Sequence, residues 1–153
     1  AAVPSERAGY AVLGANRELS GAEVELVPLP QREKRLKAAL AAVDADYDFV
    51  LVDCPPSLSL LTLNGLCAAH GVIVPMQCEY FALEGLTDLV NTIKQVHANL
   101  NPELKIIGLL RVMYEAPSYG LPGVVFDPSA RGSQAFVEFA REMVARAQRP
   151  DFQ

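Results

Sequence analysis

Residues 48–58, Asp-Phe-Val-Leu-Val-Asp-Cys-Pro-Pro-Ser-Leu, constrain the fold more than any other part of the chain. The apolar run from Phe49 to Val52 is typical of a buried strand, and we predict the central strand over 47–52. The run ends on one carboxylate, Asp53, and two prolines separate it from a helical pattern that Ser57 opens. The carboxyl ends of parallel strands border the ligand crevice of an α/β sheet, so we expect Asp53 in that crevice.

The position of Asp53 is compatible with two roles for its carboxylate. A lone carboxylate at a strand end is well sited to hold Mg²⁺, or a metal-bound water, on a nucleotide. The other reading is a cap for the next helix, a role for which Ser57 is the better candidate. We therefore predict a metal or phosphate role for Asp53. A further alternative makes Cys54 a nucleophile partnered by His70 or His97.

Strand and helix patterns alternate along the chain. This order predicts right-handed βαβ crossovers and an α/β fold with a mostly parallel sheet flanked by helices. Its 153 residues suit a single α/β domain over 1–153. We expect strands at 10–13, 47–52, 72–75 and 105–110, with an extended piece at 124–126. We expect helices from the capping-box pattern at Ser20 and over 31–43, 58–69, 82–100 and 133–147, the last docking Phe136, Phe139, Ala140 and Met143 on the sheet.

Charge and cysteine usage narrow the function classes. The net charge of −5 argues against autonomous nucleic-acid binding by the chain as a whole. The basic residues of 31–43 (Arg32, Lys34, Arg35 and Lys37) form either a solvated helix face or a partner surface, and we favour the solvated face. Cys54, Cys67 and Cys78 lack metal-binding spacing and are expected to be reduced, buried thiols. No apolar stretch approaches the roughly 20 residues that span a bilayer.

Three longer motifs carry a family resemblance. Asp46-Tyr-Asp-Phe-Val-Leu-Val-Asp-Cys-Pro-Pro-Ser-Leu-Ser-Leu-Leu-Thr-Leu-Asn64 resembles the Walker-B and switch II region of ParA/Soj chromosome-partitioning ATPases. Val74-Pro-Met-Gln-Cys-Glu-Tyr-Phe-Ala-Leu-Glu-Gly-Leu86 resembles the next strand, loop and helix of that family. Glu115-Ala-Pro-Ser-Tyr-Gly-Leu-Pro122 and Asp127-Pro-Ser-Ala-Arg-Gly-Ser-Gln-Ala135 resemble its C-terminal end. The resemblance extends from about Gly9 to Met143, and such long motifs are specific.

The resemblance implies a P-loop NTPase fold of the SIMIBI-like type, with ATP and Mg²⁺ as the ligands of a complete family member. It implies that Asp53 is the catalytic and magnesium-side carboxylate, acting through water. The other roles it implies are cofactor binding by Pro55, Pro56, Met113 and Tyr114, and a dimer or partner interface at Gln77, Glu79 and Tyr80. On residues alone, Pro55-Pro56 is equally a rigid turn, and Glu79 is equally a solvated side chain.

The chain departs from the family pattern in two places. Relatives begin with a deviant P-loop, Lys-Gly-Gly-Val-Gly-Lys-Thr-Thr, and no Gly-Lys-Ser/Thr triplet occurs in these 153 residues. Near Met113–Glu115 the family continues through a further helix, strand and arginine-containing loop that this sequence omits. We therefore expect an incomplete fold, corresponding to the C-terminal part of a ParA-type ATPase domain. Without a phosphate cradle the chain alone is expected to bind no nucleotide and to be inactive.

The resemblance also implies partners: a ParB-type centromere-binding protein, non-specific DNA, and a second copy in an ATP-dependent homodimer. It implies a cytoplasmic, nucleoid-associated protein without a membrane anchor. Two alternatives stay open. One is a non-catalytic fragment that acts only as a folding or association module. The other is a related ATPase that positions septa or flagella, although the mixed charges of the last helix argue against membrane targeting.

Overall fold

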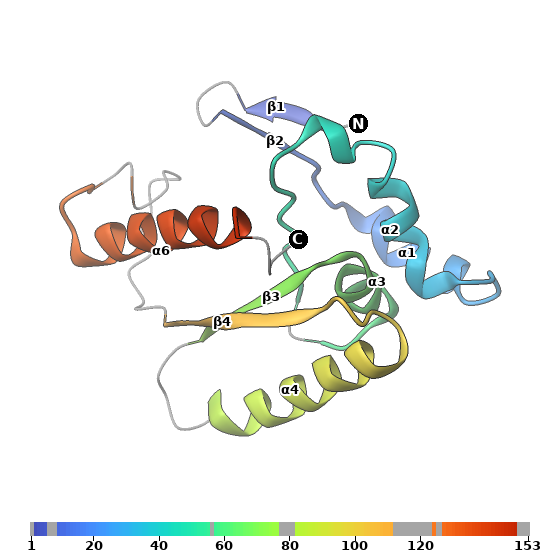
Figure 1. The fold of residues 1–153 in the computed structure, drawn as a ribbon. Coiled ribbons are helices and arrows are strands. Elements are labelled where there is room, and N and C mark those ends of the chain that lie inside the picture. Colours follow the sequence, from blue (N-terminus) through green and yellow to red (C-terminus); the bar gives the residue numbers. More distant parts are fainter. Residues whose placement is uncertain are drawn as a thin grey trace. The chain divides into compact units, whose positions relative to one another are not determined.

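The computed structural model describes residues 2–5, 9–55, 57–76, 82–111, 124 and 127–149. The chain separates into two compact units, one of residues 1–72 and 87–107, the other of residues 73–86 and 108–153. The strands and helices are shown in Figure 1. That the chain forms a single domain stays a prediction.

A small antiparallel ribbon forms the N-terminal part. β1 (Val3–Ser5) pairs with β2 (Tyr10–Val12), with Val3 opposite Val12 and Ser5 opposite Tyr10. Gly9 has a φ of 71°, a left-handed conformation that glycine adopts without steric cost, immediately before β2. The strand predicted at 10–13 is confirmed, and its partner is antiparallel.

Helix α1 (Arg17–Leu26) starts earlier than predicted. The side chain of Asn16 accepts a hydrogen bond from the Glu18 N–H at 3.0 Å and caps the helix. The capping box predicted at Ser20 is therefore wrong, because an extended Asn16 already satisfies the first turn and Ser20 lies inside the helix.

The helix predicted over 31–43 is divided. Gln31, the first residue of that range, has a φ of 51°, in the left-handed region, so regular helix begins only after it. The 3₁₀ turn η1 (Arg32–Lys34) follows and leads into α2 (Arg35–Leu40). A second 3₁₀ turn, η2 (Asp44–Asp46), comes after α2.

The central strand predicted at 47–52 is wrong. These residues form no regular strand, and their apolar side chains lie at the surface, with Leu51 88% and Phe49 51% exposed. A strand needs a neighbour that pairs with its N–H and C=O groups. The sheets of the described residues are the pairs β1–β2 and β3–β4, and neither accommodates this segment.

The following elements match the predicted α/β order. They are α3 (Leu60–Ala68), β3 (Gly71–Met76), α4 (Ala82–Asn99) and β4 (Lys105–Arg111). The Lys105 N–H donates to the His70 carbonyl at 3.0 Å, so β3 and β4 begin side by side and run parallel, with α4 as the crossover. The predicted α/β class with a parallel sheet and flanking helices is confirmed.

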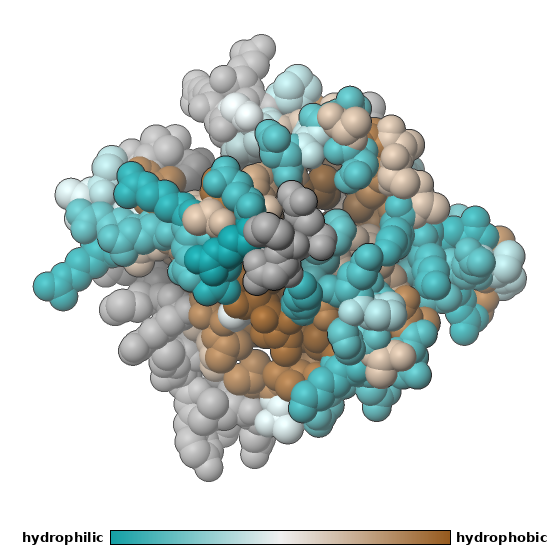
Figure 2. All heavy atoms as spheres, viewed as in Figure 1, coloured by the Kyte–Doolittle hydropathy of each residue, from teal (hydrophilic) through white to brown (hydrophobic). Residues whose placement is uncertain are grey.

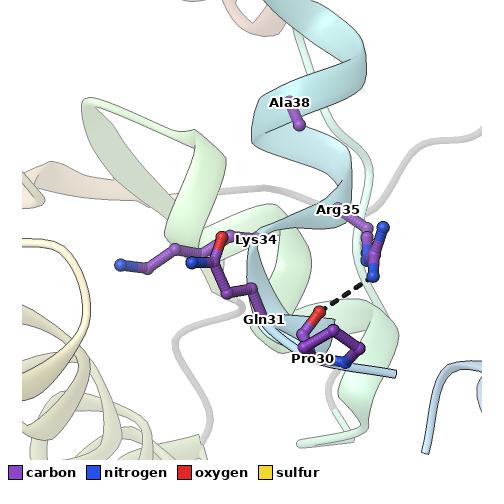
Figure 3. Close-up of a pocket in the computed structure, with 5 residues that line it drawn as sticks. All are labelled: Pro30, Gln31, Lys34, Arg35 and Ala38. Atoms are coloured by element: carbon purple, nitrogen blue, oxygen red, sulfur yellow. Dashed lines mark hydrogen bonds between the residues drawn. The ribbon is translucent and has the colours of Figure 1, made fainter. Parts of the chain in front are cut away.

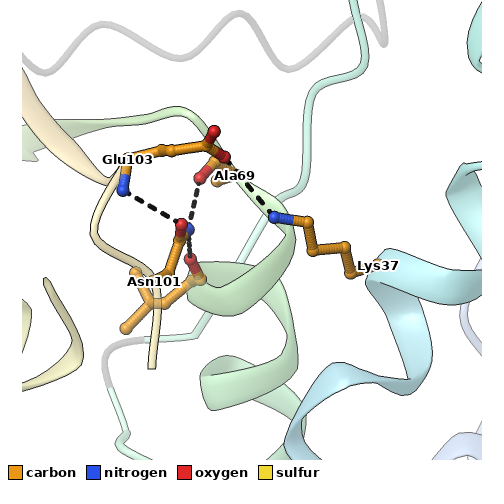
Figure 4. A network of polar contacts seen from close by, with 5 residues as sticks. Lys37, Ala69, Asn101 and Glu103 are labelled. Carbon is orange, nitrogen blue, oxygen red and sulfur yellow. Dashed lines mark hydrogen bonds and ion pairs between the residues drawn. The ribbon is translucent and has the colours of Figure 1, made fainter. Parts of the chain in front are cut away.

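The apolar core lies between α3 and α4. Its buried side chains are Leu66, Cys67, Ile93, Val96 and Leu104. Asn101, only 3% exposed, donates through Nδ2 to the carbonyls of Leu66 at 2.9 Å and Ala69 at 2.8 Å (Figure 4). This side chain caps the C-terminal end of α3 from the turn before β4. Apolar side chains also remain at the surface over the β3–β4 pair (Figure 2), where Leu109 is 54% exposed.

The last helix, α6 (Arg131–Ala147), belongs to the second unit. Phe139 and Met143 are half-buried, but Phe136 and Ala140 are exposed, so the predicted docking face is wrong for these two residues. The carboxylate of Asp127 accepts hydrogen bonds from the Ser129 N–H and hydroxyl and from the Ala130 N–H, and so folds the turn before α6. Residues 125–126 of the predicted extended piece lie outside the described residues.

Within the described ranges, no helix is both long and apolar enough to cross a membrane.

Candidate functional site

Asp53 stands at an exposed position near the start of the loop between Val52 and Ser59, which leads to α3 and is called the Asp53 loop below. Among the described residues its carboxylate has no hydrogen-bond or ion-pair partner. Partial burial raises the pKa of the neighbouring Cys54 thiol, and the Asp53 carboxylate raises that pKa further. A raised pKa keeps Cys54 protonated at neutral pH, which argues against the alternative that it is a nucleophile.

The entry of the loop rests on α3 at Gly65. A Cβ atom at Gly65 would lie 3.0 Å from Cys54 Sγ and 3.5 Å from Val52 Cγ1. A side chain at position 65 would be tight against Cys54, so Gly65 lets the residues on both sides of Asp53 lie close to the helix.

The exit of the loop is fixed by the first turn of α3. Ser59 is the N-cap, and its Oγ accepts hydrogen bonds from the N–H groups of Leu61 at 3.2 Å and Thr62 at 3.3 Å. The Thr62 hydroxyl donates to the Ser57 carbonyl at 2.8 Å. The prediction that Ser57 caps this helix is wrong, because Ser59 has the extended conformation of a cap and Ser57 contributes only its carbonyl. The capping alternative for Asp53 is excluded by the same contacts.

Two side chains from α1 and α3 hold α3 in place. Glu23 of α1 accepts a hydrogen bond from the Leu60 N–H at 3.0 Å. Asn64, only 4% exposed, accepts from the Leu36 N–H at 3.1 Å and donates to the Arg32 carbonyl at 2.8 Å. Asn64 is therefore buried, although asparagine is mostly an exposed residue. The missed signal is a polar residue inside an otherwise apolar helical stretch.

The basic residues of η1 and α2 serve mostly local contacts. Arg35 donates to the Pro30 carbonyl at 2.9 Å beside an open pocket that Gln31, Lys34 and Ala38 also line (Figure 3). Arg32 donates to the Val27 carbonyl, and Lys37 pairs with Glu103 at 3.5 Å (Figure 4). These exposed contacts agree with the solvated face that we favoured.

The other predicted site residues divide into two groups. Pro55 is exposed and follows Asp53 within the described loop. The remaining six lie outside the described residues: Pro56, Gln77, Glu79, Tyr80, Met113 and Tyr114. Of the three cysteines, Cys67 is buried as expected at 1% exposure, Cys54 is exposed, and Cys78 also lies outside the described residues.

The residues present fit a water-mediated role toward magnesium. In the described part of the chain, no three His, Cys, Asp or Glu side chains are grouped to hold a metal ion. Mg²⁺ on a nucleotide keeps several waters and needs one or two carboxylates in addition to phosphate oxygens. The exposed carboxylate of Asp53, which has no hydrogen-bond partner in the described part, can meet that demand.

Known proteins match most of the chain. The family profile described as "AAA domain" matches residues 1–106. The chromosome partitioning protein ParA of Caulobacter vibrioides is 41% identical, with 95% of this chain and 68% of that protein aligned. The chromosome-partitioning ATPase Soj of Treponema pallidum is 44% identical, over 86% of this chain and 66% of that protein.

A solved structure shares the fold. It is cobyrinic acid a,c-diamide synthase from Mycobacterium smegmatis with bound ATP analog and magnesium, which is 38% identical and has a TM-score of 0.83. The match covers 96% of this chain and 67% of that one.

The chain spans about two thirds of the length of these relatives. The alignment with the Caulobacter protein runs over 182 positions, more than the 153 residues here. That relative therefore carries residues without a counterpart in this sequence, and the departure near Met113–Glu115 stays a prediction. The family profile, these identities and the shared motifs together show that the chain belongs to the ParA/Soj family of chromosome-partitioning P-loop NTPases.

Proposed function

We propose that this chain carries the Walker-B and switch II part of a ParA-type ATPase that partitions chromosomes or plasmids. The observation that carries the proposal is Asp53: an exposed carboxylate, without a hydrogen-bond partner in the described part, on a loop whose two ends are held against α3 at Gly65 and Thr62. An exposed carboxylate on a loop that is held at both ends is suited to act on a metal-bound ligand. Membership of the family supplies the ligand class.

In this proposal Asp53 accepts hydrogen bonds from water on a nucleotide-bound magnesium ion. Magnesium, when bound with ATP, neutralises charge on the phosphoryl group being transferred. The contribution of this chain is to hold the carboxylate in position, and Pro55 and Pro56 limit the backbone freedom of the loop beside it. Met113 and Tyr114 are proposed to lie at the nucleotide base.

Dimerisation and partners belong to the same proposal. Gln77, Glu79 and Tyr80 follow β3 and are proposed to form the interface of an ATP-dependent homodimer. The proposed partners are a ParB-type centromere-binding protein and non-specific DNA, in a cytoplasmic, nucleoid-associated setting. Arg32 and Arg35 donate to backbone carbonyls, and Lys37 pairs with Glu103, and these local contacts favour a DNA surface elsewhere than η1 and α2.

A second candidate is a non-catalytic association module. It is favoured by the exposed apolar segment Phe49–Val52, which is patterned as a strand but has no strand partner among the described residues. The absence of a Gly-Lys-Ser/Thr triplet from the 153 residues also supports it, since such a chain has no phosphate cradle of its own.

The test combines intact mass, MgATP binding by calorimetry and ATP turnover on the purified protein. If the protein binds MgATP, Asp53→Asn should lower turnover by about 100-fold or more while binding is largely retained. Asp48→Asn is the matched control, since Asp48 is an exposed carboxylate at the other end of the same segment, and it should leave turnover unchanged.

Unchanged turnover in Asp53→Asn would remove Asp53 from the mechanism. Absence of MgATP binding by a protein of 16.5 kDa would instead support the association module.

A further inference from the structure

A carboxylate from α1 caps α3 at the point where the Asp53 loop ends. Glu23 Oε1 accepts a hydrogen bond from the Leu60 N–H at 3.0 Å, joining residues 37 positions apart. Leu60 is the first residue of α3, and the first N–H groups of a helix have no partner inside the helix. Ser59 satisfies the next two, those of Leu61 and Thr62. Glu23 therefore completes the capping of this turn, and its negative charge also suits the helix N-terminus.

The same turn of α3 carries the loop. The Thr62 hydroxyl holds the Ser57 carbonyl at 2.8 Å, and the Ser59 N–H also donates to that carbonyl at 3.1 Å. One turn further along, Gly65 receives Cys54 and Val52 from the loop entry. The first turn of α3 thus contacts the end of the loop directly, and the next turn contacts its beginning.

From these contacts we infer that Glu23 is a positioning residue for the Asp53 loop, acting through the first turn of α3. The role assigned to Asp53 rests on the proposed function, whereas the coupling between Glu23 and the loop does not. Asn64, a residue of α3 itself, joins the helix to η1 and α2 at a point beyond its first turn, so it anchors the helix body. Glu23 acts on the turn that the loop contacts directly.

The test compares Glu23→Ala and Glu23→Gln with Glu25→Ala in this chain. Glu25 is an exposed acidic residue of the same helix, so its variant matches the loss of charge and of side chain. Two readouts are followed without nucleotide: amide hydrogen exchange at Leu60 by NMR, and the alkylation rate of Cys54 by iodoacetamide, resolved by peptide mass spectrometry.

Glu23→Ala should accelerate both readouts by about fivefold, the change expected for loss of a helix cap. Glu23→Gln should stay within about twofold of the parent, because its amide oxygen can still accept the Leu60 hydrogen bond. Glu25→Ala should leave both rates unchanged. Should Glu23→Ala lose its helical circular dichroism signal, Glu23→Asp takes its place. Its carboxylate is one methylene shorter, and it should accelerate both rates as predicted for Glu23→Ala.

Equal behaviour of Glu23→Ala and Glu25→Ala would overturn the inference. So would faster exchange at Leu60 with an unchanged rate at Cys54, since Glu23 would then be a local cap that does not position the loop. Neither readout involves ATP, so a failure to bind MgATP would count against the proposed function alone.

Discussion

The side chain of Asn64 accepts a hydrogen bond from the backbone N–H of Leu36 at 3.1 Å, and so joins α3 to the start of α2. The same amide donates to the carbonyls of Arg32 at 2.8 Å and Leu60 at 2.9 Å. One buried polar side chain thereby satisfies three backbone groups on two separate segments.

Asn64→Ala should lower the free energy of unfolding by about 1–3 kcal/mol, because it leaves the Leu36 N–H and the Arg32 carbonyl without their partner. Urea unfolding followed by circular dichroism measures the change. Asn99→Ala is the control, since Asn99 is exposed and its side chain makes a local bond to the Gln95 carbonyl within α4. Equal losses in both variants would contradict the anchoring role of Asn64.

Asn101 offers a second test of buried capping. Asn101→Asp should destabilise the fold at least as much as Asn101→Ala, by about 1–3 kcal/mol or more. The aspartate has no N–H to donate and would place a negative charge against the carbonyls of Leu66 and Ala69 (Figure 4). Thermal and urea unfolding of both variants give the comparison, and a less destabilised aspartate variant would refute the proposed donor role.

Gly65→Ala should displace the loop from α3. The added methyl group would lie 3.0 Å from Cys54 Sγ, so the thiol must move and its alkylation by iodoacetamide should accelerate. Gly21→Ala is the matched control: Gly21 lies within α1 and a Cβ there meets no atom within 4 Å. That variant should stabilise the chain by about 0.5–1 kcal/mol and leave the Cys54 rate unchanged.

The charge of Asp53 should be detectable through Cys54. Partial burial and then the Asp53 carboxylate raise the pKa of the Cys54 thiol above its ordinary value. Asp53→Asn removes the second cause, so the pKa of Cys54 should fall and its alkylation at pH 8 should become faster. The pH dependence of the alkylation rate measures this shift. An unchanged midpoint would show that Asp53 does not act on the thiol, and Asp48→Asn controls for the loss of one negative charge.

Asp127 should make the turn before α6 sensitive to acid. Hydrogen bonds from the Ser129 hydroxyl and N–H, and from the Ala130 N–H, lower the pKa of Asp127 below its ordinary 3.8. A lowered folded-state pKa contributes stability that is present above the ordinary value and is lost as pH falls through the folded value. An NMR titration of the Asp127 carboxyl carbon and the Ser129 amide should therefore show both moving together below pH 3.8. Separate midpoints would contradict the coupling.

Sequence periodicity was sufficient for the elements that pack locally. In residues 82–100 the apolar residues recur at helical spacing, and residues 105–110 are largely apolar. Helix α4 and strand β4 match these two ranges to within one residue. The same reasoning failed at 47–52, because an apolar run specifies a strand only where another strand pairs with its backbone. It also failed at Ser57 and Ser20, since cap choice among nearby polar residues depends on which one takes up the extended conformation.

The amino-acid sequence by itself determined the α/β order of the chain and, through its long motifs, the family, whereas Asp53 as the carboxylate of interest stays a prediction. The tertiary structure alone decided which contacts fix α3, the helix at which the loop after Asp53 ends. Glu23 meets Leu60 across 37 residues, and Asn64 meets Leu36 across 28. Such contacts have no local pattern in the sequence, because they depend on where separate helices pack rather than on spacing within one of them.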